Sequence, residues 1–389
     1  MKKLFALSLS LLLMISCAPA QKEIQVGALS FDEYLPLLEG KRVSILSNQT
    51  GMVSSTTHLL DTLLDMGVNV VSIMSPEHGF RGVADAGEHV SSSIDEATGI
   101  PIRSLYESGV NRPSDESMAE FDVMVFDLQD VGVRFYTYNA TMARMMDACA
   151  QFGKKMIVLD RPNPLGYYVD GPILDMQYKS GVGWLPVPVV HGMTLGELAL
   201  MINGEGWLKD GAQCDLTVVP CKNYTRDMEY VLPIKPSPNL PNMKSIYLYP
   251  STCYFEATPV SLGRGTDKPF QIYGHPDMTG YEFSFTPRSV PGAKNPPQLD
   301  KLCYGVDLSG LSDEQIKAEG INLEYVIDAY NNLKLDDKEM FRKFFELLIG
   351  QGYVREMIVE GKSAAEIEAM WAEDVEKFKE QRAPYLIYE

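Results

Sequence analysis

Strand-like and helix-like segments alternate through the first half of the chain, and this alternation limits the possible folds more than any other feature. The strand-like segments are almost continuously apolar, as expected of strands that are buried on both faces. The helix-like segments show apolar residues at three- and four-residue spacing. This pattern predicts an α/β domain of the Rossmann-like class, with a mostly parallel sheet and helices on both faces. The strand-like segments are residues 42–50, 68–79, 100–106, 121–130, 154–164 and 214–221, and the helix-like segments are 54–67, 138–153 and 191–207.

A second domain is expected, because about 370 residues beyond an N-terminal leader are too many for one ordinary core. The proline-rich stretch at 233–242 cannot continue a helix or a central strand. Beyond it come aromatic, loop-rich sequence and then amphipathic helices. We therefore predict a Rossmann-like domain at 24–232 and an α+β auxiliary domain at 233–389. The last predicted helix places Ile367, Met370, Trp371, Val375 and Phe378 on one apolar stripe.

Residues 1–20 resemble a bacterial export signal, with two lysines followed by an apolar run that is too short to span a membrane. Met14 to Cys17 reads as a lipobox, which would make Cys17 the lipidated first residue of the mature chain. A simple cleavage site near Ala18–Ala20 is the alternative. We expect an exported protein in the periplasm or at the cell surface, tied to a membrane only through a lipid anchor.

The net charge and the cysteine spacing argue against a nucleic-acid-binding protein, a Cys/His metal site and a disulfide-bonded fold. A net charge of −18 argues against nucleic acid as a partner. The chain has no CxxC pair and no Cys/His spacing typical of a metal site. Cys214 and Cys221 flank a strand-like segment and would lie roughly 23 Å apart when extended, beyond the reach of a disulfide. The cysteines after Cys17 are therefore expected to be buried and unpaired.

Polar side chains follow five consecutive strands of the predicted sheet. In an open parallel sheet, ligands bind in the crevice beyond the carboxyl ends of the strands. Each residue alone is more often a turn former or a helix cap; Asp127 could be a cap, and Asp160 with Arg161 a structural ion pair. Their coincidence at one edge predicts a polar cleft there. These residues are Asn48, Gln49, Glu77, His78, Tyr106, Asp127, Gln129, Asp130, Arg134, Asp160, Arg161 and Asn163.

The chain lacks the motifs of nucleotide-binding proteins, serine hydrolases and common metalloenzymes, and this limits the reactions that the cleft could catalyse. The chain has no G-x-G-x-x-G after a strand, no Walker A loop and no G-x-S-x-G elbow. A metal site is a weak alternative, because there is no HExxH or H-x-H pair. Paired carboxylates remain, and these are the groups that glycoside hydrolysis uses. A carboxyl that follows the apolar run VVSIM could have a raised pKa and serve as a general acid. The possible metal ligands are Glu77, His78, His89, Asp127 and Asp130.

A second dense polar stretch lies at 249–270, in the auxiliary domain. Glu256, Arg264, Thr266 and Asp267 occur there among glycine and proline turns. The glycines of GRGTDKPF would let the backbone approach a ligand closely. We predict a binding loop, with a surface loop that carries a salt bridge as the alternative.

Six further motifs occur along the chain in a fixed order. They are SPEHGFRG, FDLQDVGVRFYTY, LDRPNP, HGMTLGEL, PSPNLPN and GRGTDKPF. In this order they resemble the NamZ-type exo-β-N-acetylmuramidases, and the similarity extends over residues 26–388. The resemblance implies a glycosidase, without a cofactor, that releases N-acetylmuramic acid from the non-reducing end of peptide-free peptidoglycan chains. It also implies an active site in a cleft between a Rossmann-like domain and a C-terminal auxiliary domain.

The resemblance assigns the catalytic glutamate to Glu77, within SPEHG. Asp130, Glu256 and Asp127, in that order, are the candidates for the second catalytic group. His78 is expected to tune Glu77 or to bond a sugar hydroxyl. An arginine is expected to hold the lactyl carboxylate of muramic acid through two hydrogen bonds. The arginine candidates are Arg81, Arg134, Arg161 and Arg264; Tyr106, Tyr136 and Tyr138 could stack on the sugar; and Asp127, Gln129, Asp160, Asn163 and Thr266 complete the expected binding residues.

Two other functions remain open at this point. The first is a non-catalytic cell-wall sugar-binding lipoprotein with the same cleft. The second is a metal-dependent hydrolase that uses this cleft. The expected partners are in each case peptidoglycan fragments, which are chains of alternating N-acetylmuramic acid and N-acetylglucosamine.

Overall fold

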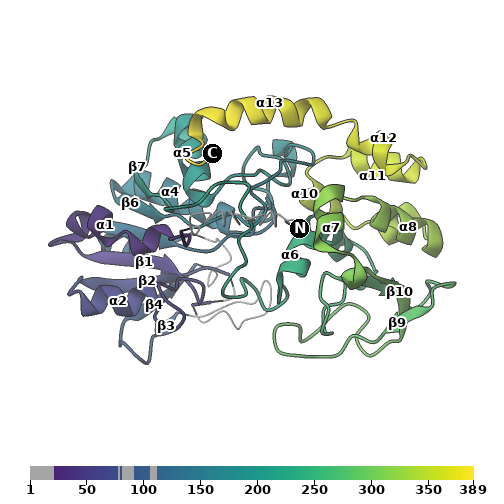
Figure 1. Cartoon of the computed structure of the whole chain (residues 1–389), viewed down its shortest axis with the longest axis horizontal. Coiled ribbons are helices and arrows are strands. Elements are labelled where there is room, and N and C mark those ends of the chain that lie inside the picture. Colours follow the sequence, from purple (N-terminus) through teal and green to yellow (C-terminus); the bar gives the residue numbers. More distant parts are fainter. Residues whose placement is uncertain (1–21, 78, 81–91, 106–111) are drawn as a thin grey trace, which may run out of the picture.

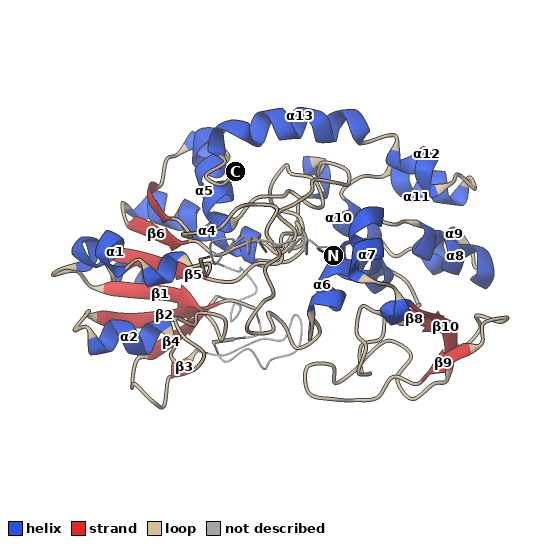
Figure 2. Cartoon of the chain, viewed as in Figure 1, coloured by secondary structure: helices blue, strands red, loops and turns tan. Residues whose placement is uncertain are grey.

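The structure, a computed structural model, describes residues 22–77, 79–80, 92–105 and 112–389. A sheet-containing unit and a mostly helical unit lie side by side, and the last long helix runs from the second back to the first (Figure 1). Figure 2 shows that loops, rather than helices or strands, fill most of the region between the sheet and the helical unit.

The first unit contains a seven-stranded sheet in the order β3-β4-β2-β1-β5-β6-β7. All neighbouring strands are parallel except the edge pair β3 and β4. The predicted parallel sheet of the Rossmann-like class is therefore confirmed, although the short antiparallel edge strand was not expected. The strands are β1 Val43–Ser47, β2 Val70–Ser75, β3 Ser93–Ile94, β4 Pro101–Ser104, β5 Val123–Asp127, β6 Lys155–Leu159 and β7 Asp215–Val219.

Helices cover both faces of this sheet, which explains why its strands are apolar along their whole length. On β5, Val123 and Val125 belong to a core that includes residues of α1 and α2. The alternate residues, Met124 and Phe126, belong to a larger core that includes residues of α4 and α5. The helical elements of this unit are η1 Gly27–Leu29, α1 Phe31–Leu38, α2 Leu59–Asp65, α3 Asp115–Ala119, α4 Tyr138–Phe152, η2 Met176–Tyr178, α5 Leu195–Gly204 and η3 Lys209–Gly211.

Local signals explain where these helices begin and end. Thr194 and Glu197 form the capping box that the sequence predicts for α5. Helix α4 ends at Gly153, which has a left-handed backbone that glycine adopts without strain. Helix α2 begins at His58, whose Nδ1 accepts a hydrogen bond from the amide of Leu60 (3.1 Å). The ring of His58 therefore accepts the N-cap hydrogen bond that a serine, threonine, aspartate or asparagine side chain more often accepts.

The second unit is an α+β region, as predicted, with a small antiparallel sheet in the order β8-β10-β9. The helix predicted around residues 367–378 is two helices, because the chain breaks its helical course between Glu368 and Ala372. Met370 lies in this break and is exposed. The elements are α6 Met243–Thr252, η4 Cys253–Ala257, β8 Ile272–His275, β9 Phe283–Phe285, β10 Cys303–Asp307, η5 Leu308–Gly310, α7 Asp313–Glu319, α8 Glu324–Leu333, α9 Asp337–Met340, α10 Phe344–Ile349, α11 Tyr353–Val359, α12 Ala364–Glu368, α13 Ala372–Arg382 and η6 Ala383–Tyr385.

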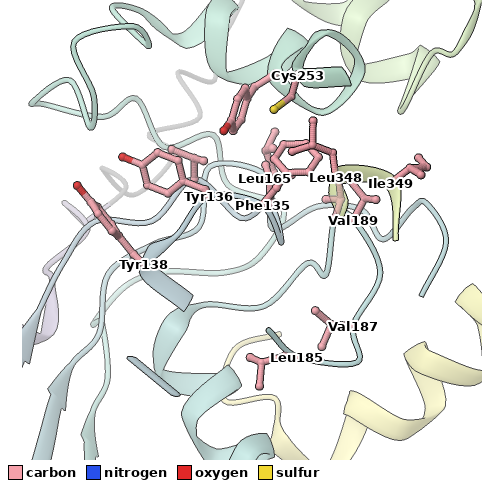
Figure 3. Close-up of a cluster of buried hydrophobic side chains, with 14 of the residues drawn as sticks. Phe135, Tyr136, Tyr138, Leu165, Leu185, Val187, Val189, Cys253, Leu348 and Ile349 are labelled. Atoms are coloured by element: carbon pink, nitrogen blue, oxygen red, sulfur yellow. The ribbon is translucent and has the colours of Figure 1, made fainter. Parts of the chain in front are cut away.

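The two units share one hydrophobic core. Figure 3 shows Phe135 beside Leu348, Ile349 and Cys253, so side chains of the first unit pack directly against the second. Because this apolar contact is extensive, we expect the two units to hold a fixed relative position.

The end of the chain returns to the first unit after the helical unit is complete. Tyr385 donates a hydrogen bond to Glu205 at the end of α5 (2.7 Å). Tyr388 is buried, and its hydroxyl donates to Asp160 beyond β6 (2.7 Å). The predicted boundary near residue 232 falls in the loop between β7 and α6, yet the last residues of the chain pack on the first unit.

The five cysteines of the described chain are buried and form no disulfide, as expected. They are Cys149, Cys214, Cys221, Cys253 and Cys303. Within the described ranges, no helix is both long and apolar enough to cross a membrane.

Candidate active site

Glu77 lies just beyond the carboxyl end of β2, on a tight turn. The amide of Gly79 donates to the carbonyl of Pro76 (3.0 Å), and Gly79, the last residue of the turn, has a positive φ that glycine adopts without strain. Glu77 is half-buried, and its Oε2 accepts a hydrogen bond from Thr137 Oγ1 (2.6 Å). The turn thus brings a carboxyl group out of a buried strand and against the start of α4.

Glu77 faces a small pocket to which both units contribute, and we call it the Glu77 pocket. Its cavity measures about 80 Å³. The first unit supplies the turn after β2 and the residues around the start of α4. The second unit supplies α6, η4 and the loop that follows. The lining residues are Glu77, Phe135, Tyr136, Thr137, Tyr138, Val182, Ser237, Leu240, Tyr249, Glu256, Arg264 and Phe270.

A second carboxylate, Glu256, enters the same pocket from η4. It pairs with Arg264, whose Nη2 lies 2.5 Å from Glu256 Oε1. Both side chains keep some contact with solvent, with exposed fractions of 23% for Glu256 and 17% for Arg264. The guanidinium of Arg264 lies over the ring of Phe270, at 5.1 Å from its centroid. The pocket therefore holds two glutamates, one of them anchored to a cation.

Tyrosines form one side of the pocket, and hydrogen bonds hold them in place. Tyr136 donates to the carbonyl of Pro236 (2.9 Å), and Tyr138 accepts from Asn48 Nδ2 (2.6 Å). The rings of Tyr136 and Tyr138 meet edge to face at 4.7 Å, and Figure 3 shows them side by side. Tyr249 contacts the ring of Tyr136 in the same way. Such a surface suits the apolar face of a sugar ring.

Asp130, the first-ranked candidate for the second catalytic group, does not line the Glu77 pocket. It is buried, and burial raises the pKa of its carboxyl to about 7. Oδ2 accepts a hydrogen bond from the amide of Gly132 (2.8 Å), while Oδ1 has no partner among the described residues. The structure thus places Asp130 beneath the cleft and favours Glu256 as the second carboxylate.

Asp127 and Arg161, two further candidates, form a buried ion pair. Arg161 Nε and Nη2 donate to the two carboxylate oxygens of Asp127, at 2.6 and 2.9 Å. Side-chain exposure is 3% for Arg161 and 0% for Asp127. The prediction that these residues bind substrate is corrected, because each is already bound to the other beneath the surface. The alternative considered for Asp160 and Arg161 was a structural ion pair between them. Arg161 does form a structural ion pair, but its partner is Asp127.

Arg134 was expected to hold a substrate carboxylate, but it is fully buried. Its Nη1 donates to the carbonyls of Pro172 and Val187, and its Nη2 to those of Leu348 and Ile349, all at 2.8–2.9 Å. Burial lowers its pKa to about 10. Arg134 therefore joins two loops of the first unit to the end of α10, and its predicted binding role is corrected to a structural one.

Three more predicted binding residues support local structure. Asp160 accepts hydrogen bonds from Thr194 Oγ1 (2.6 Å) and the amide of Gly196 (2.8 Å), so it anchors the start of α5. Burial raises the pKa of Asp160 to about 6. Asn163 and Gln129 are buried and bond to nearby backbone groups. None of the three lines the Glu77 pocket.

Thr266 closes a turn next to Arg264. Its hydroxyl donates to the carbonyl of Gly263 (2.7 Å) and accepts from the amide of Lys268 (3.0 Å). It shapes the loop that carries Arg264 and does not line the pocket itself. His78, Arg81, Tyr106 and Cys17 lie outside the described residues, and so does His89.

Several pocket residues were not predicted as site residues. Thr137 is the most important, because it bonds Glu77 directly. It lies between Tyr136 and Tyr138 at the start of α4, where the sequence is also consistent with an ordinary helix N-terminus. Ser237, Tyr249 and Phe270 also line the pocket. They lie in segments that the sequence analysis singled out, PSPNLPN and residues 249–270, but were not themselves predicted as site residues.

The described part of the chain contains no group of three or more His, Cys, Asp or Glu side chains arranged to hold a metal ion.

Comparison with known proteins connects this chain to a family. The family model "Exo-beta-N-acetylmuramidase NamZ, N-terminal" matches residues 43–244, and its C-terminal counterpart matches residues 247–388. The chain is 38% identical over 374 residues to the peptidoglycan beta-N-acetylmuramidase NamZ of Bacillus subtilis (strain 168), covering 92% of this chain and 89% of that protein.

Two crystal structures from Bacteroides fragilis NCTC 9343, both of DUF1343 family proteins, have the same fold. The first is 62% identical, with a TM-score of 0.88, and the match covers 95% of this chain and 99% of that one. The second is 29% identical, with a TM-score of 0.79, and the match covers 94% of this chain and 99% of that one.

Proposed function

The chain belongs to the NamZ family of exo-β-N-acetylmuramidases, and we propose that it releases N-acetylmuramic acid from the non-reducing end of peptidoglycan chains. The observation that supports this most directly is the pair of glutamates in one pocket. Glu77 comes from the sheet edge and Glu256 from the second unit, so the packed two-unit fold is needed to bring them together.

The two glutamates are assigned different roles. Glu77 lies in the motif that carries the family's catalytic glutamate, is half-buried, and accepts a hydrogen bond from Thr137. It is our candidate for the general acid, which gives its proton to the glycosidic oxygen as the bond to the anomeric carbon breaks. Glu256 is held beside the guanidinium of Arg264. It stabilises the positive charge that develops on the sugar or directs the water whose hydroxyl ends on the anomeric carbon.

Arg264 is the candidate for recognising the lactyl carboxylate of muramic acid. Among the described arginines predicted for this role, only Arg264 lines the Glu77 pocket, because Arg134 and Arg161 are buried elsewhere. A guanidinium has five N–H donors, and Glu256 engages Arg264 through Nη2. A positive group at this point also suits an acidic sugar bound by a protein of net charge −18.

The test is hydrolysis of an aryl β-glycoside of N-acetylmuramic acid, with the N-acetylglucosamine glycoside as the substrate control. We expect release from the muramic compound only. Glu77→Gln should lower kcat by about 10²- to 10⁴-fold, the contribution typical of a general acid. Glu39→Gln, an exposed glutamate at the end of α1, is the matched control and should behave as wild type. Full activity in Glu77→Gln would contradict the assignment, and activity on neither glycoside would favour a binding protein.

Thr137→Val removes the hydroxyl that bonds Glu77 and keeps the shape of the side chain. We expect a smaller loss of kcat than in Glu77→Gln, because the carboxyl group remains but loses the hydrogen bond that holds it in position. An unchanged kcat would mean that Thr137 only fills space.

We further propose that the protein is exported and carries a lipid on Cys17, on the basis of its leader sequence. The test is membrane fractionation of cells labelled with a radioactive fatty acid. Cys17→Ala should abolish the label and move the protein to the soluble fraction. Label that persists in Cys17→Ala would contradict the proposal.

A further inference from the structure

The Glu77 pocket has a larger neighbour that shares two of its residues. This second cavity measures about 370 Å³, against about 80 Å³ for the Glu77 pocket. Glu256 and Arg264 line both, so their ion pair forms the common wall. The rest of the second cavity comes from Leu262 and from residues 292–297, and we call it the 292–297 groove.

Glu77 lines only the smaller cavity, while Glu256 lines both. In a glycosidase the two carboxyl groups flank the bond that is cut. With the acid Glu77 in one cavity and Glu256 at the boundary, the cut bond lies near that boundary. The two halves of the substrate must then extend to opposite sides of it.

We propose that the 292–297 groove binds the part of the substrate that leaves after cleavage, namely the N-acetylglucosamine next to the cut bond and the muramic acid residue that follows. This inference rests on the proposed function. It makes residues of the groove, Lys294 and Asn295 above all, determinants of the preference for chains over single glycosides.

The groove is built before a ligand arrives, because its wall is fixed on two sides. Gly265 lies so close to this wall that a Cβ there would lie 2.7 Å from Cγ of Pro296. Gly292 touches the interdomain link, where a Cβ would lie 2.5 Å from that of Pro238. Asn239 Nδ2 also donates to the carbonyl of Gly292 (2.8 Å). A preformed site loses less conformational entropy on binding than a loop that must be ordered.

The chemistry of the groove suits an amino sugar chain. Leu262, Ala293 and Pro297 line it with apolar groups, while Asn295 brings an amide that can both donate and accept hydrogen bonds. Lys294 is exposed, and the apolar stem of a lysine can cover the face of a sugar ring while its charged head keeps its own contacts.

The experiment compares two substrates that differ only beyond the cut bond. The aryl glycoside of N-acetylmuramic acid places a small ring in the groove, whereas the tetrasaccharide of two N-acetylmuramic acid–N-acetylglucosamine units occupies it fully. We measure kcat/KM for both, and from them the ratio of tetrasaccharide to aryl glycoside. The variants are Lys294→Ala and Asn295→Trp, the second of which fills the groove from an exposed position. Lys301→Ala, an exposed lysine outside the groove, is the control.

We expect each groove variant to lower the ratio by at least about tenfold, the effect of losing one good contact, and Lys301→Ala to leave it unchanged. An unchanged ratio in both groove variants would overturn the inference. Equal losses on both substrates would also overturn it, because the groove would then hold the terminal sugar. The proposed function fails separately, if the wild-type protein releases N-acetylmuramic acid from neither substrate.

Discussion

Two carboxylate–arginine pairs, Asp127–Arg161 and Glu256–Arg264, have similar bond lengths but differ in their exposure to solvent. Their shortest N···O distances are 2.6 and 2.5 Å. The first pair is almost wholly excluded from solvent, with 3% and 0% exposure, whereas the second keeps 17% and 23% at the pocket wall. The difference teaches that the surroundings of an ion pair, rather than its geometry, separate a structural pair from one that can act on a ligand.

The position of each pair in the fold explains this difference. Asp127 ends β5 in the middle of the sheet, and Gly51 closes over it, because a Cβ at Gly51 would lie 3.1 Å from Asp127 Oδ2. Glu256 lies instead on a short helical turn, and Arg264 on a loop between two glycines with positive φ. These elements meet at the boundary of two cavities, where water and substrate have access.

The largest expected effect on stability comes from breaking the buried pair. Asp127→Asn would leave Arg161 charged and uncompensated, and removal of one partner of a buried pair costs about 3–5 kcal/mol. We expect a large fall in the urea midpoint of unfolding, with kcat close to wild type wherever the protein is folded. The double variant Asp127→Asn/Arg161→Met should recover part of the stability. Normal stability with lost activity would place Asp127 in the chemistry and remove the contrast between the pairs.

The opposite result is expected for the pocket pair. Glu256→Gln should lower kcat by about 10²-fold, equivalent to about 2.7 kcal/mol of transition-state stabilisation. Thermal unfolding should change little, since both partners reach solvent and the remaining Arg264 can be hydrated. Steady-state kinetics and calorimetry on the same preparation measure both quantities. Lost stability with normal kcat would show that this pair too is structural.

A third carboxylate, Asp130, can be compared with these two pairs because it is buried but has no cation beside it in the described structure. Its pKa, about 7, lies above that of the unfolded chain, so the folded state holds the proton more tightly. The resulting stability is complete below about pH 4 and is lost as pH rises through 7, with a slope of up to about 1.4 kcal/mol per pH unit.

Asp130→Asn should remove the contribution of Asp130 to the pH dependence of the unfolding free energy. The contribution of Asp160, whose pKa is about 6, should remain. Urea unfolding at pH 5, 6, 7 and 8 gives the comparison. Parallel pH profiles for the variant and the wild type would mean that Asp130 titrates normally.

The smallest effect is expected at a fully surface pair. Arg288 and Asp300 lie 2.8 Å apart, but each is 64% exposed. Asp300→Asn should shift Tm by less than about 2 °C, because exposed pairs contribute little. A shift as large as that of Asp127→Asn would show that burial is not the property that distinguishes these pairs.

The order of strands and helices could be predicted because each element carries a local signal. The apolar runs, the Thr194–Glu197 capping box and the glycine stops all act within a few residues. Strand β3 was missed because two exposed residues carry no such signal. The position of Glu77 beyond β2 was predictable for the same reason as the sheet.

The composition of the pocket could not be predicted in the same way. Glu256 lies in the same pocket as Glu77 only because the two units pack together. The hydrophobic periodicity of a sequence cannot predict a contact between residues about 180 positions apart. Burial also reversed several expectations: Arg134 and Asp160 follow strands, as binding residues would, but they are bonded to the protein itself. A strand-end position indicates an edge of the sheet, and only tertiary structure separates its surface from its interior.

The return of the C-terminus to the first unit has a consequence for the order of events during synthesis. Tyr388 bonds Asp160 and packs with Tyr224 beside the sheet. Domains usually fold as they emerge, N-terminal part first. Here the first unit lacks part of its interior until residue 388 has been made, long after its last strand, β7, which ends at Val219. For a chain that we propose is exported, this delay leaves the sheet unit incomplete for longer, and so easier to thread unfolded through a translocation channel.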